Sequence, residues 1–353
     1  MRVLLTGATG FAGSHLAEFI TVRHPHVALY GTYRWRSRLD NLDDLAASGS
    51  VDVLQGALPQ DASLRTATRA GRLTLLECDH ADPFAIAAIV RAVEPDRVFH
   101  VAAQSFVPAS FAEPATTLAE PATTLATNIL GELHLLEAVR SHAPRRACSS
   151  PDRARSTARC GRKSYRFGRR TSYDRFHPMP SARSPKTGWR GSTTRATAFT
   201  SSSRVRSNHT GPRGGDVFAE SSFARQIAEI ELERPPGVIR VGDLSSERDW
   251  HDVRDTARAY WLALEHGATG EVYNVGSGTS LPVREVLQAL LAFVAGPSVT
   301  VEEDPARLRP SDVPILCADA TKFRDRTGWS PAIPLERSLA DLLEWWRARL
   351  RKR

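Results

Sequence analysis

The chain has 353 residues, is 41% hydrophobic and carries a formal net charge of +8. That length and apolar content suffice for one large core with a smaller lobe beside it. The positive charge alone would suggest a nucleic-acid or membrane partner, but it is concentrated in one segment. Residues 145–207 hold 17 Lys and Arg against two acids, which leaves 30 basic and 37 acidic residues elsewhere. Outside that segment the chain is an ordinary, mildly acidic protein.

Cysteine spacing and hydropathy exclude several classes of protein. The cysteines are Cys78, Cys148, Cys160 and Cys317, and no two of them form a CxxC pair. This excludes a zinc ribbon and gives no disulfide framework. Met1 leads directly into a strand pattern, and no apolar run approaches about 18 residues. We therefore expect a cytoplasmic protein with no signal peptide, no metal site and no membrane partner.

The chain begins with alternating strand and helix patterns. We expect strands at residues 2–5, 27–32, 73–78 and 97–103, and helices after Gly13, at 84–93 and at 125–139. Such alternation predicts an α/β fold with a doubly wound parallel sheet. Later helices are expected at 218–231, 253–265, 283–294 and 335–350, with a strand at 271–275. We expect residues 1–207 to form a Rossmann domain. Residues 208–353 are expected to form mainly a smaller C-terminal substrate lobe, with some elements returning to the first domain.

A glycine-rich turn follows the first strand and opens a helix. Its glycines, spaced Gly7-x-x-Gly10-x-x-Gly13, allow a tight turn and a close approach to a pyrophosphate at the helix N-terminus. The alternative is a turn with no ligand. The candidate cofactor-binding residues in this turn are Thr6, Gly7, Gly10, Phe11, Ala12 and Gly13. Those at the ends of later strands are Asp79, which suits an adenine pocket, and Ala102, Ala103 and Gln104.

The end of the second strand predicts which dinucleotide binds. An acid is expected there for NAD, but the chain continues with Arg34 and Arg36. A guanidinium binds a 2′-phosphate through paired hydrogen bonds, so the sequence favours NADP and leaves NAD as the alternative. Arginines on a solvated loop are the other interpretation.

These motifs together resemble the extended short-chain dehydrogenase/reductase family of sugar-nucleotide enzymes. The matching segments are TGATGFAGSHL, VFHVAAQSFVPASF, NILGELHLLEAV, NHTGPRGGDVF, SSFARQIAEIE, VGDLSSERDWHDVRD, EVYNVGSG and RPSDVPIL, in that order. NHTGP and RDWHDVRD look most like GDP-mannose 4,6-dehydratases and the related GDP-4-keto-6-deoxymannose reductases. The resemblance implies a GDP-sugar substrate and a homo-oligomer, either a dimer or a tetramer.

The resemblance also assigns substrate-binding residues. They are Ser105, Asn208, His209, Val217, Phe218, Arg248 and Arg309. Arginines suit the diphosphate because they offer paired donors to its oxygens. On spacing alone, a salt bridge of Arg248 with Asp252 or Asp255 is an equal alternative. His100 and His251 are expected to be structural.

The reactive groups of the family are missing from the sequence. The family transfers hydride from C4 of the hexose to the nicotinamide, with a tyrosine base whose pKa is lowered by a lysine four residues on. A Ser or Thr binds the same hydroxyl, and in dehydratases a Glu two residues later removes the C5 proton. The chain contains no Tyr-x-x-x-Lys sequence, so no catalytic residue is intact. The gap falls in residues 145–207, which contain no Leu or Ile. We therefore expect no packed strand or helix there.

The genetic code offers an explanation for this segment. Codons starting one base earlier permit Tyr-Ala-Val-Ser-Lys within residues 178–183 and a strand followed by Gly-Ser-Ser-Glu-Val-Tyr-Gly within residues 147–158. The same frame permits Arg-Pro-Phe at 204–207, directly before Asn208. We hypothesise compensating single-base insertions or deletions near codons 145 and 207.

Two classes of function follow from these observations. The first is dehydration of GDP-mannose to GDP-4-keto-6-deoxymannose, with reduction of that product or another sugar-nucleotide epimerisation as alternatives. The chain with the printed segment is expected to turn over little. The second class is an inactive nucleotide-binding protein, or an arginine-rich protein that binds nucleic acid through phosphate neutralisation. A nucleic-acid partner is the less favoured interpretation, because the segment replaces family elements at about the same length.

Overall fold

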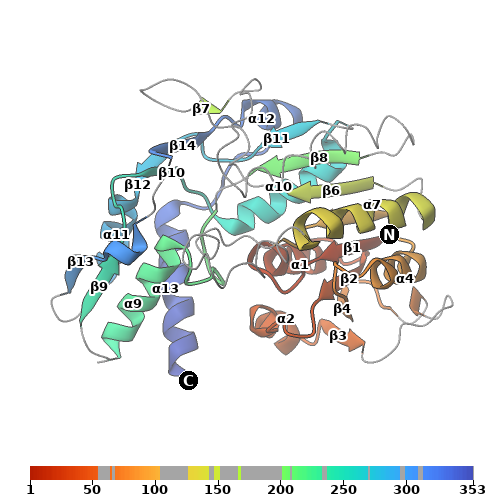
Figure 1. Ribbon diagram of the computed structural model, residues 1–353, viewed down its shortest axis with the longest axis horizontal. Helices are drawn as coiled ribbons and strands as arrows, with labels where there is room; N and C mark the ends of the chain where they lie inside the picture. Colours follow the sequence, from red (N-terminus) through yellow and green to blue (C-terminus); the bar gives the residue numbers. More distant parts are fainter. Residues whose placement is uncertain are drawn as a thin grey trace. The chain divides into compact units, whose positions relative to one another are not determined.

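The computed structural model describes residues 1–54, 64–65, 68–103, 126–142, 147–151, 166–167, 201–206, 209–232, 237–268, 271–294, 299–308 and 313–352. It divides into two compact units. Unit 1 comprises Met1–Ser156, Arg175–Val205 and Ala257–Tyr273, and unit 2 comprises Thr157–Asp174, Arg206–Thr256 and Asn274–Arg353. Figure 1 labels the elements and colours them in chain order from red to blue.

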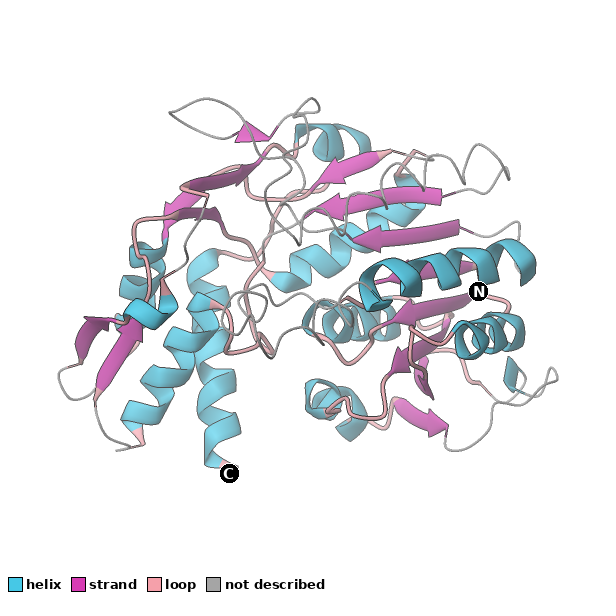
Figure 2. Cartoon of the chain, viewed as in Figure 1, coloured by secondary structure: helices cyan, strands magenta, loops and turns pink. Residues whose placement is uncertain are grey.

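Unit 1 is built on an eight-stranded sheet, drawn in magenta in Figure 2. Its strand order is β11-β8-β6-β5-β1-β2-β4-β3. The strands are β1 (Arg2–Thr6), β2 (Ala28–Tyr33), β3 (Val51–Leu54), β4 (Arg72–Glu77), β5 (Arg97–His100), β6 (Ala147–Pro151), β8 (Ser201–Arg206) and β11 (Val272–Asn274). From β3 through to β8, every neighbouring pair is parallel. Parallel pairing requires crossover connections, and helices supply them where the connections are described.

Helices cover both faces of this sheet. They are α1 (Phe11–Arg23), α2 (Asp43–Ala47) with a preceding 3₁₀ turn (Asp40–Leu42), α4 (Pro83–Val93), a π-helical turn (Ala126–Leu130), α7 (Gly131–His142) and α10 (Val253–His266). α4 and α7 pack on one face in a cluster that includes Leu4, Val98, Ile89 and Leu135. On the other face, Trp261 of α10 stacks on His24 after α1 and lies against Phe99. Successive residues of a strand point to opposite faces of the sheet. Val98 therefore packs towards α4 and α7, and Phe99 packs towards α10.

Local sequence signals fix the ends of α4. The Asp82 carboxylate accepts hydrogen bonds from the N–H groups of Phe84 (2.8 Å) and Ala85 (3.3 Å), and Pro83 occupies the first turn. A side-chain cap followed by proline is a strong helix start, because the carboxylate accepts N–H groups that have no helical partner and proline has no N–H that needs one. The helix ends at Glu94, which adopts a left-handed conformation with φ of 44°.

Unit 2 contains two small sheets and four helices among its described residues. One sheet has the order β12-β10-β14-β7, and in the other β13 pairs with β9 in parallel. The strands are β7 (Arg166–Phe167), β9 (Val238–Val241), β10 (Glu247–Asp249), β12 (Ser280–Pro282), β13 (Thr300–Glu303) and β14 (Ile315–Ala318). The helices are α9 (Ala219–Glu231), α11 (Val283–Leu291), α12 (Thr321–Thr327) and α13 (Leu335–Arg351), with a 3₁₀ turn at Pro305–Arg307.

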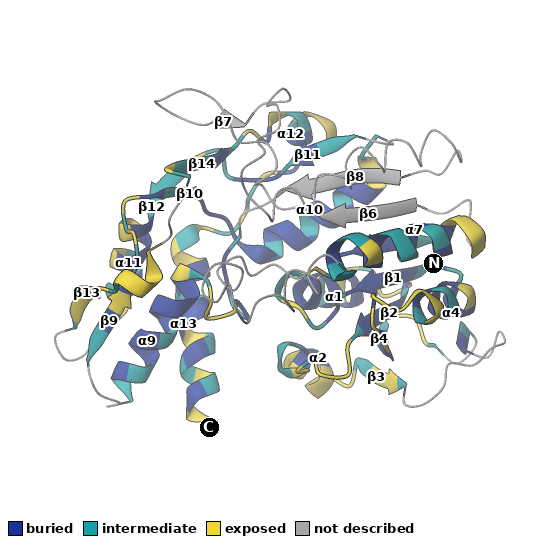
Figure 3. Ribbon diagram, in the orientation of Figure 1, coloured by how far each residue is buried: buried dark blue, intermediate teal, exposed yellow. Residues whose placement is uncertain are grey.

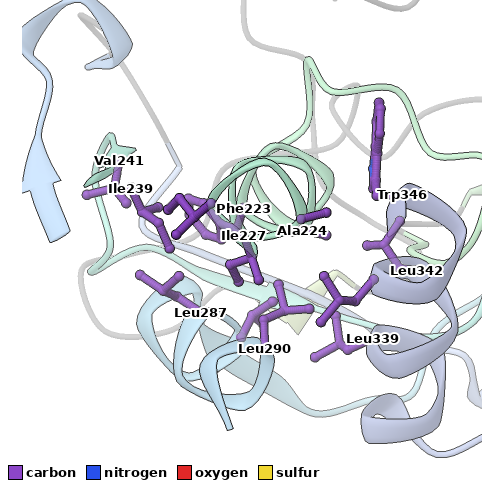
Figure 4. Close-up of a cluster of buried hydrophobic side chains, with 14 of the residues drawn as sticks. Phe223, Ala224, Ile227, Ile239, Val241, Leu287, Leu290, Leu339, Leu342 and Trp346 are labelled. Carbon is purple, nitrogen blue, oxygen red and sulfur yellow. The ribbon is translucent and has the colours of Figure 1, made fainter. Parts of the chain in front are cut away.

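The core of unit 2 lies between α9, α11, α13 and β9. Figure 4 shows Phe223 and Ile227 of α9 beside Leu287 and Leu290 of α11, with Leu339 of α13 to the right of Leu290. These side chains are at most 3% exposed. In Figure 3, these helices have a buried side, coloured dark blue, and an exposed side, coloured yellow. Burying such side chains contributes about 1.5–3 kcal/mol each relative to leaving them in water.

Our expectation that residues 145–207 contain no packed strand is wrong, because three short strands fall in that range. β6 pairs in parallel with β5 on one side and with β8 on the other, so both β6 and β8 lie in the central sheet. The pairing uses main-chain N–H and C=O groups, which do not depend on aliphatic side chains. β7 also falls in this segment and pairs with β14. The rest of the segment, including the expected catalytic helix, lies outside the described residues.

Several expected elements have different bounds from those predicted; among them, the helix expected at 283–294 ends at Leu291. The strand expected at 97–103 ends at His100, because the N–H of Ala102 bonds to the side chain of Thr6 (3.2 Å) instead of continuing the ladder. The helix expected at 125–139 consists of the π-helical turn and then α7, which continues to His142.

Candidate functional site

The glycine turn between β1 and α1 is held in a compact conformation. Gly7 has φ of +71°, a conformation that side chains disfavour, and its carbonyl oxygen accepts the N–H of Gly10 (3.0 Å). A Cβ built on Gly7 would lie 2.8 Å from the Cα of Ala102, and one built on Gly13 would lie 2.0 Å from the Gly7 carbonyl oxygen. Gly7 and Gly13 therefore exclude side chains for reasons of space.

The turn presents the N-terminus of α1. Gly10 is the N-cap and brings no side chain to the first turn, which consists of Phe11, Ala12 and Gly13. The first N–H groups of a helix have no partner within the helix, and with the helix dipole they favour an anion. The structure therefore brings together the six residues predicted in the turn, from Thr6 to Gly13. The turn from Gly7 to Gly13 and the first N–H groups of α1 form a cradle, an arrangement that favours an anionic group.

The residues predicted after β4 and after β5 lie at the same edge of the sheet, because these strands run parallel. Ala102 approaches Gly7 as described, and Ala103 is exposed next to it. Asp79 follows β4, and its Oδ1 accepts the N–H of Ala81 (2.9 Å). Burial raises the pKa of the preceding Cys78 thiol to about 12, which keeps it protonated and unreactive. Gln104 and Ser105 lie outside the described residues.

Arg34 begins the loop after β2. Its N–H donates to Ser37 Oγ (3.2 Å), and its carbonyl oxygen accepts the N–H of Ser37 (2.7 Å), so the loop turns back on itself. Arg34, Trp35 and Arg36 are exposed, and the Arg36 guanidinium lies 4.3 Å from the centre of the Trp35 ring. An exposed guanidinium at the end of this strand can bind a phosphate on the adenosine ribose.

Sequence reasoning did not identify a buried polar layer beneath the glycine turn. Thr32 Oγ1 accepts the N–H of Gly7 (3.3 Å) and lies 2.9 Å from His80 Nε2. Thr6 Oγ1 lies 2.8 Å from His100 Nδ1. The sequence signal for this layer is a polar residue at the end of a strand, such as Thr6, Thr32 or His100. Apolar periodicity does not detect such residues.

In unit 2, the segment that follows Asn208 is joined to the segment before α10. The N–H of Thr210 donates to the His251 carbonyl oxygen, and the N–H of Val253 donates to the Thr210 carbonyl oxygen, both at 2.9 Å. The rings of His209 and His251 are 6.4 Å apart. His251 is 2% exposed, and its Nε2 lies 3.0 Å from Thr256 Oγ1. These two hydrogen bonds fix the main chain next to His209. Asn208 itself lies outside the described residues.

The other predicted substrate residues of unit 2 lie at a turn and on a strand. Val217 is 43% exposed, and Phe218 is the N-cap of α9. Arg248 is on β10, where its Nη1 donates to the carbonyl oxygens of Glu247 (2.7 Å) and Val313 (2.8 Å). Arg309 lies outside the described residues.

The two carboxylates considered as partners of Arg248 make other contacts. Asp252, which is 0% exposed, receives two hydrogen bonds from the Arg254 guanidinium, at 2.7 and 2.8 Å. Burial alone would raise the pKa of Asp252, but the hydrogen bonds from Arg254 hold it below its ordinary value. Asp255 accepts the N–H groups of Ala332 (2.8 Å) and Ile333 (2.9 Å). Both carboxylates therefore have local structural roles.

A family comparison decides where the chain belongs. The sequence model described as GDP-mannose 4,6 dehydratase matches residues 4–150 and 191–342. The chain belongs to the GDP-mannose 4,6-dehydratase family. The match contains the glycine turn, β5, the His209 segment and β10. It omits residues 151–190, which fall inside the basic segment.

Individual members of this family match almost the whole chain. The GDP-6-deoxy-D-mannose reductase of Pseudomonas aeruginosa is 28% identical over 372 residues, covering 99% of each chain. The GDP-mannose 4,6 dehydratase 1 of Arabidopsis thaliana is 27% identical over 348 residues, covering 95% of this chain and 86% of the plant protein. A solved structure of RMD from Pseudomonas aeruginosa complexed with NADPH superposes with a TM-score of 0.76, at 25% identity and with 99% of each chain covered.

Two other kinds of site are absent from the ranges that the structure describes. In those ranges, no three His, Cys, Asp or Glu side chains are grouped so as to hold a metal ion. Within the same part of the chain, no helix has the length and apolar character needed to cross a membrane.

Proposed function

We propose that this protein is a sugar-nucleotide lyase that converts GDP-mannose to GDP-4-keto-6-deoxymannose with NADP as its cofactor. The observation that carries the proposal is the glycine cradle at the N-terminus of α1, in a chain that belongs to the GDP-mannose 4,6-dehydratase family. The cradle supports the binding of a dinucleotide cofactor, and the family supports a sugar nucleotide as the class of substrate.

Different residues of unit 1 would bind different parts of the cofactor. The Gly7–Gly13 turn and the first N–H groups of α1 would bind the pyrophosphate. Arg34 would bind the 2′-phosphate, and Asp79 would contact the adenine. Bound NADP supplies a nicotinamide that takes a hydride from the sugar and returns it. In support of NADP, the matching RMD structure was solved with NADPH.

The residues of unit 2 would bind the GDP-sugar. We infer that Asn208 and His209 contact the diphosphate, that Val217 and Phe218 contact the nucleobase, and that Arg248 and Arg309 neutralise phosphate charge. The two hydrogen bonds between Thr210 and the 251–253 segment support this role for His209, because they fix the main chain from which it projects. Ser105, after β5, would contact the hexose.

A reductase is the second candidate, and one specific observation favours it. The 28% identity to the Pseudomonas aeruginosa GDP-6-deoxy-D-mannose reductase extends over 99% of both chains. A reductase would use the same cofactor site and would reduce a 4-keto sugar. The alternative reading frame favours the dehydratase, because it permits the glutamate that removes the C5 proton.

We further propose that residues 145–207 are an out-of-frame copy of the catalytic segment and that the protein with the printed sequence turns over little. The family match is interrupted at residues 151–190, within this segment, and resumes at residue 191, so residues 145–150 and 191–207 lie inside the match. Sequencing the gene tests this directly. Third codon bases that forbid the Ser/Glu and Tyr-x-x-x-Lys motifs in the other frame would contradict it.

The activity test compares the printed chain with a chain in which residues 145–207 are translated from the alternative frame. Each is incubated with GDP-mannose and NADP, and the product is followed by mass spectrometry for the loss of one water. We expect rapid conversion by the restored chain and little by the printed one. A restored chain that leaves GDP-mannose intact but oxidises NADPH with the 4-keto sugar would identify a reductase instead. Equal turnover by both chains would refute the loss of the catalytic segment.

We propose two further properties. We expect a homodimer or tetramer, which light scattering on the purified protein would measure, and a cytoplasmic location, which cell fractionation would test. An arginine-rich nucleic-acid binder is the contrasting function. It requires oligonucleotide affinity that falls steeply with salt, about one power of salt concentration per phosphate neutralised.

A further inference from the structure

Two threonine–histidine pairs lie beneath the glycine turn. Thr32 on β2 pairs with His80 (2.9 Å), which follows β4, and Thr6 on β1 pairs with His100 on β5 (2.8 Å). The two imidazole rings lie side by side, with centroids 5.7 Å apart and planes 24° from parallel. All four side chains are at most 4% exposed, so their polar atoms depend on one another and on the main chain for hydrogen bonds.

Each threonine also holds a main-chain group next to the cradle. Thr32 Oγ1 accepts the N–H of Gly7 (3.3 Å), and the Thr32 carbonyl oxygen accepts the N–H of Ala8 (3.1 Å). Thr6 Oγ1 accepts the N–H of Ala102 (3.2 Å). The backbones of Gly7 and Ala102 approach each other closely beside the cradle, so the two pairs support the turn from both sides.

The Thr32 hydroxyl connects the turn to His80. Its lone pairs accept the Gly7 N–H, and its single proton can point at Nε2 of a neutral imidazole. His80 is neutral near pH 7, because burial lowers its pKa to about 4, more than the nearby Asp79 carboxylate raises it, and the Arg34 guanidinium lowers it further. Neutral His80 can make this hydrogen bond in either direction, according to which ring nitrogen carries the proton, and in both cases Thr32 Oγ1 can also accept the Gly7 N–H.

His80 is in turn fixed by α7. The Nδ1 of His134 lies 3.2 Å from the His80 carbonyl oxygen. Gly131 begins α7 directly against His80: a Cβ built on Gly131 would lie 3.0 Å from the His80 Cβ and 3.2 Å from its carbonyl oxygen. A continuous chain of contacts therefore runs from α7 through His80 and Thr32 to Gly7.

We propose that His80 is a positioning residue which, through Thr32, couples the placement of α7 to the glycine turn and so sets the affinity of the turn for the pyrophosphate of the dinucleotide. This inference rests on the proposed NADP-binding function. Neither His80 nor Thr32 touches the ligand in this scheme. They act by holding the Gly7 and Ala8 N–H groups in the arrangement that the cradle needs.

The test separates a positioning role from a general loss of structure by using two ligands. NADPH contains the pyrophosphate, whereas adenosine 2′-monophosphate has the adenosine and the 2′-phosphate but no pyrophosphate. Thr32→Val keeps the shape of the side chain and removes its hydroxyl. We expect it to weaken NADPH binding about tenfold and to change adenosine 2′-monophosphate binding by less than about twofold. Thr32→Ser, which restores a hydroxyl, should recover most of the NADPH affinity.

A matched control is available on the neighbouring strand. Thr74 on β4 is 6% exposed, and Thr74→Val removes a buried hydroxyl outside the network, so NADPH affinity should stay within about twofold. Thermal unfolding of each variant confirms that the proteins compared are folded. An equal loss of both ligands in Thr32→Val, or no loss of NADPH, would overturn the inference.

A double-mutant cycle tests the coupling to α7. Gly131→Ala adds a methyl group against His80 and should weaken NADPH about fivefold in the unsubstituted chain. In the Thr32→Val background the connection is already broken, so the same substitution should have less than about a twofold effect. Equal effects in both backgrounds would refute the coupling. If the unsubstituted chain does not bind NADPH, the proposed function itself fails. If that chain binds NADPH and the variants do not differ from it, only this inference fails.

Discussion

Gly13, in the first turn of α1, lies so close to Gly7 that a Cβ built on it would sit 2.0 Å from the Gly7 carbonyl oxygen. The same carbonyl oxygen accepts the N–H of Gly10, so it cannot move away without breaking the turn. The third glycine of the motif is therefore required by contact with the first. The spacing of the motif reflects this contact as well as the approach of a ligand.

Gly13→Ala should open the turn and abolish measurable NADPH binding. An alanine Cβ at position 13 would lie 2.0 Å from the Gly7 carbonyl oxygen, so the backbone of the turn would have to move. We expect the affinity for NADPH to fall at least about a hundredfold. Gly215→Ala is the matched control, because a Cβ there would meet its nearest atom at 3.7 Å. Titration of NADPH into each variant, followed by fluorescence, measures the effect. Wild-type affinity in Gly13→Ala would contradict the role assigned to the turn.

The glycine turn could be predicted from sequence because its spacing is local and its conformation needs only neighbouring residues. Apolar periodicity likewise placed α4, whose capping residue Asp82 and first-turn Pro83 are adjacent in sequence. His80 and Thr32 could not be found in this way, since 48 residues separate them and only the sheet brings them together.

The error at β6 has a different cause from the omission of His80. Composition indicates whether a segment can bury apolar surface, and residues 145–207 cannot bury much. Pairing with a sheet edge uses backbone groups, so it depends little on composition. β6 pairs with β5 in this way, and the composition of residues 145–207 gives no sign of that pairing.

Arg34 is expected to set the preference for NADPH over NADH. Arg34→Ala should lower the ratio of the two affinities about twentyfold, because the 2′-phosphate loses a charge-assisted partner. Arg38→Ala is the control, since Arg38 is exposed on the same loop but lies 3.2 Å from Asp40 in an ion pair. Competitive titrations with the two cofactors give the ratio. A preference that Arg34→Ala leaves unchanged would assign the 2′-phosphate to another residue.

His80 should make the protein less stable in acid. Its pKa is about 4 in the folded protein because of burial, against 6.5 when the chain is unfolded. The unfolded chain therefore binds a proton first, and the contribution of neutral His80 is fully present above pH 6.5. It is lost as the pH falls from 6.5 towards 4 and reaches a loss of about 3 kcal/mol.

Urea unfolding across this pH range measures the loss, with His80→Gln as the reference because glutamine does not titrate. The free energy of unfolding should fall more steeply with acid in the unsubstituted chain than in the variant. Parallel pH profiles would show that His80 is not buried as a neutral group.

Arg254 should be important for the stability of unit 2. Asp252 is 0% exposed and receives two hydrogen bonds from Arg254, which also contacts Asp341 at 2.8 Å. Arg254→Met keeps most of the side-chain volume but leaves the buried Asp252 carboxylate without its cation. We expect a loss of about 2 to 4 kcal/mol in the free energy of unfolding, below the upper end for fully buried pairs because the Arg254 side chain is 37% exposed.

Arg337 provides the comparison for Arg254, because it contacts the same Asp341 (2.8 Å) from the surface, with its side chain 72% exposed. Arg337→Met should cost less than about 1 kcal/mol, since water and salt screen exposed ion pairs. Raising the salt concentration should weaken the Arg337 contribution and leave that of Arg254 largely unchanged. Similar losses in the two variants would show that water reaches Asp252, and the pairing at Asp252 would then not stabilise the segment that holds His209.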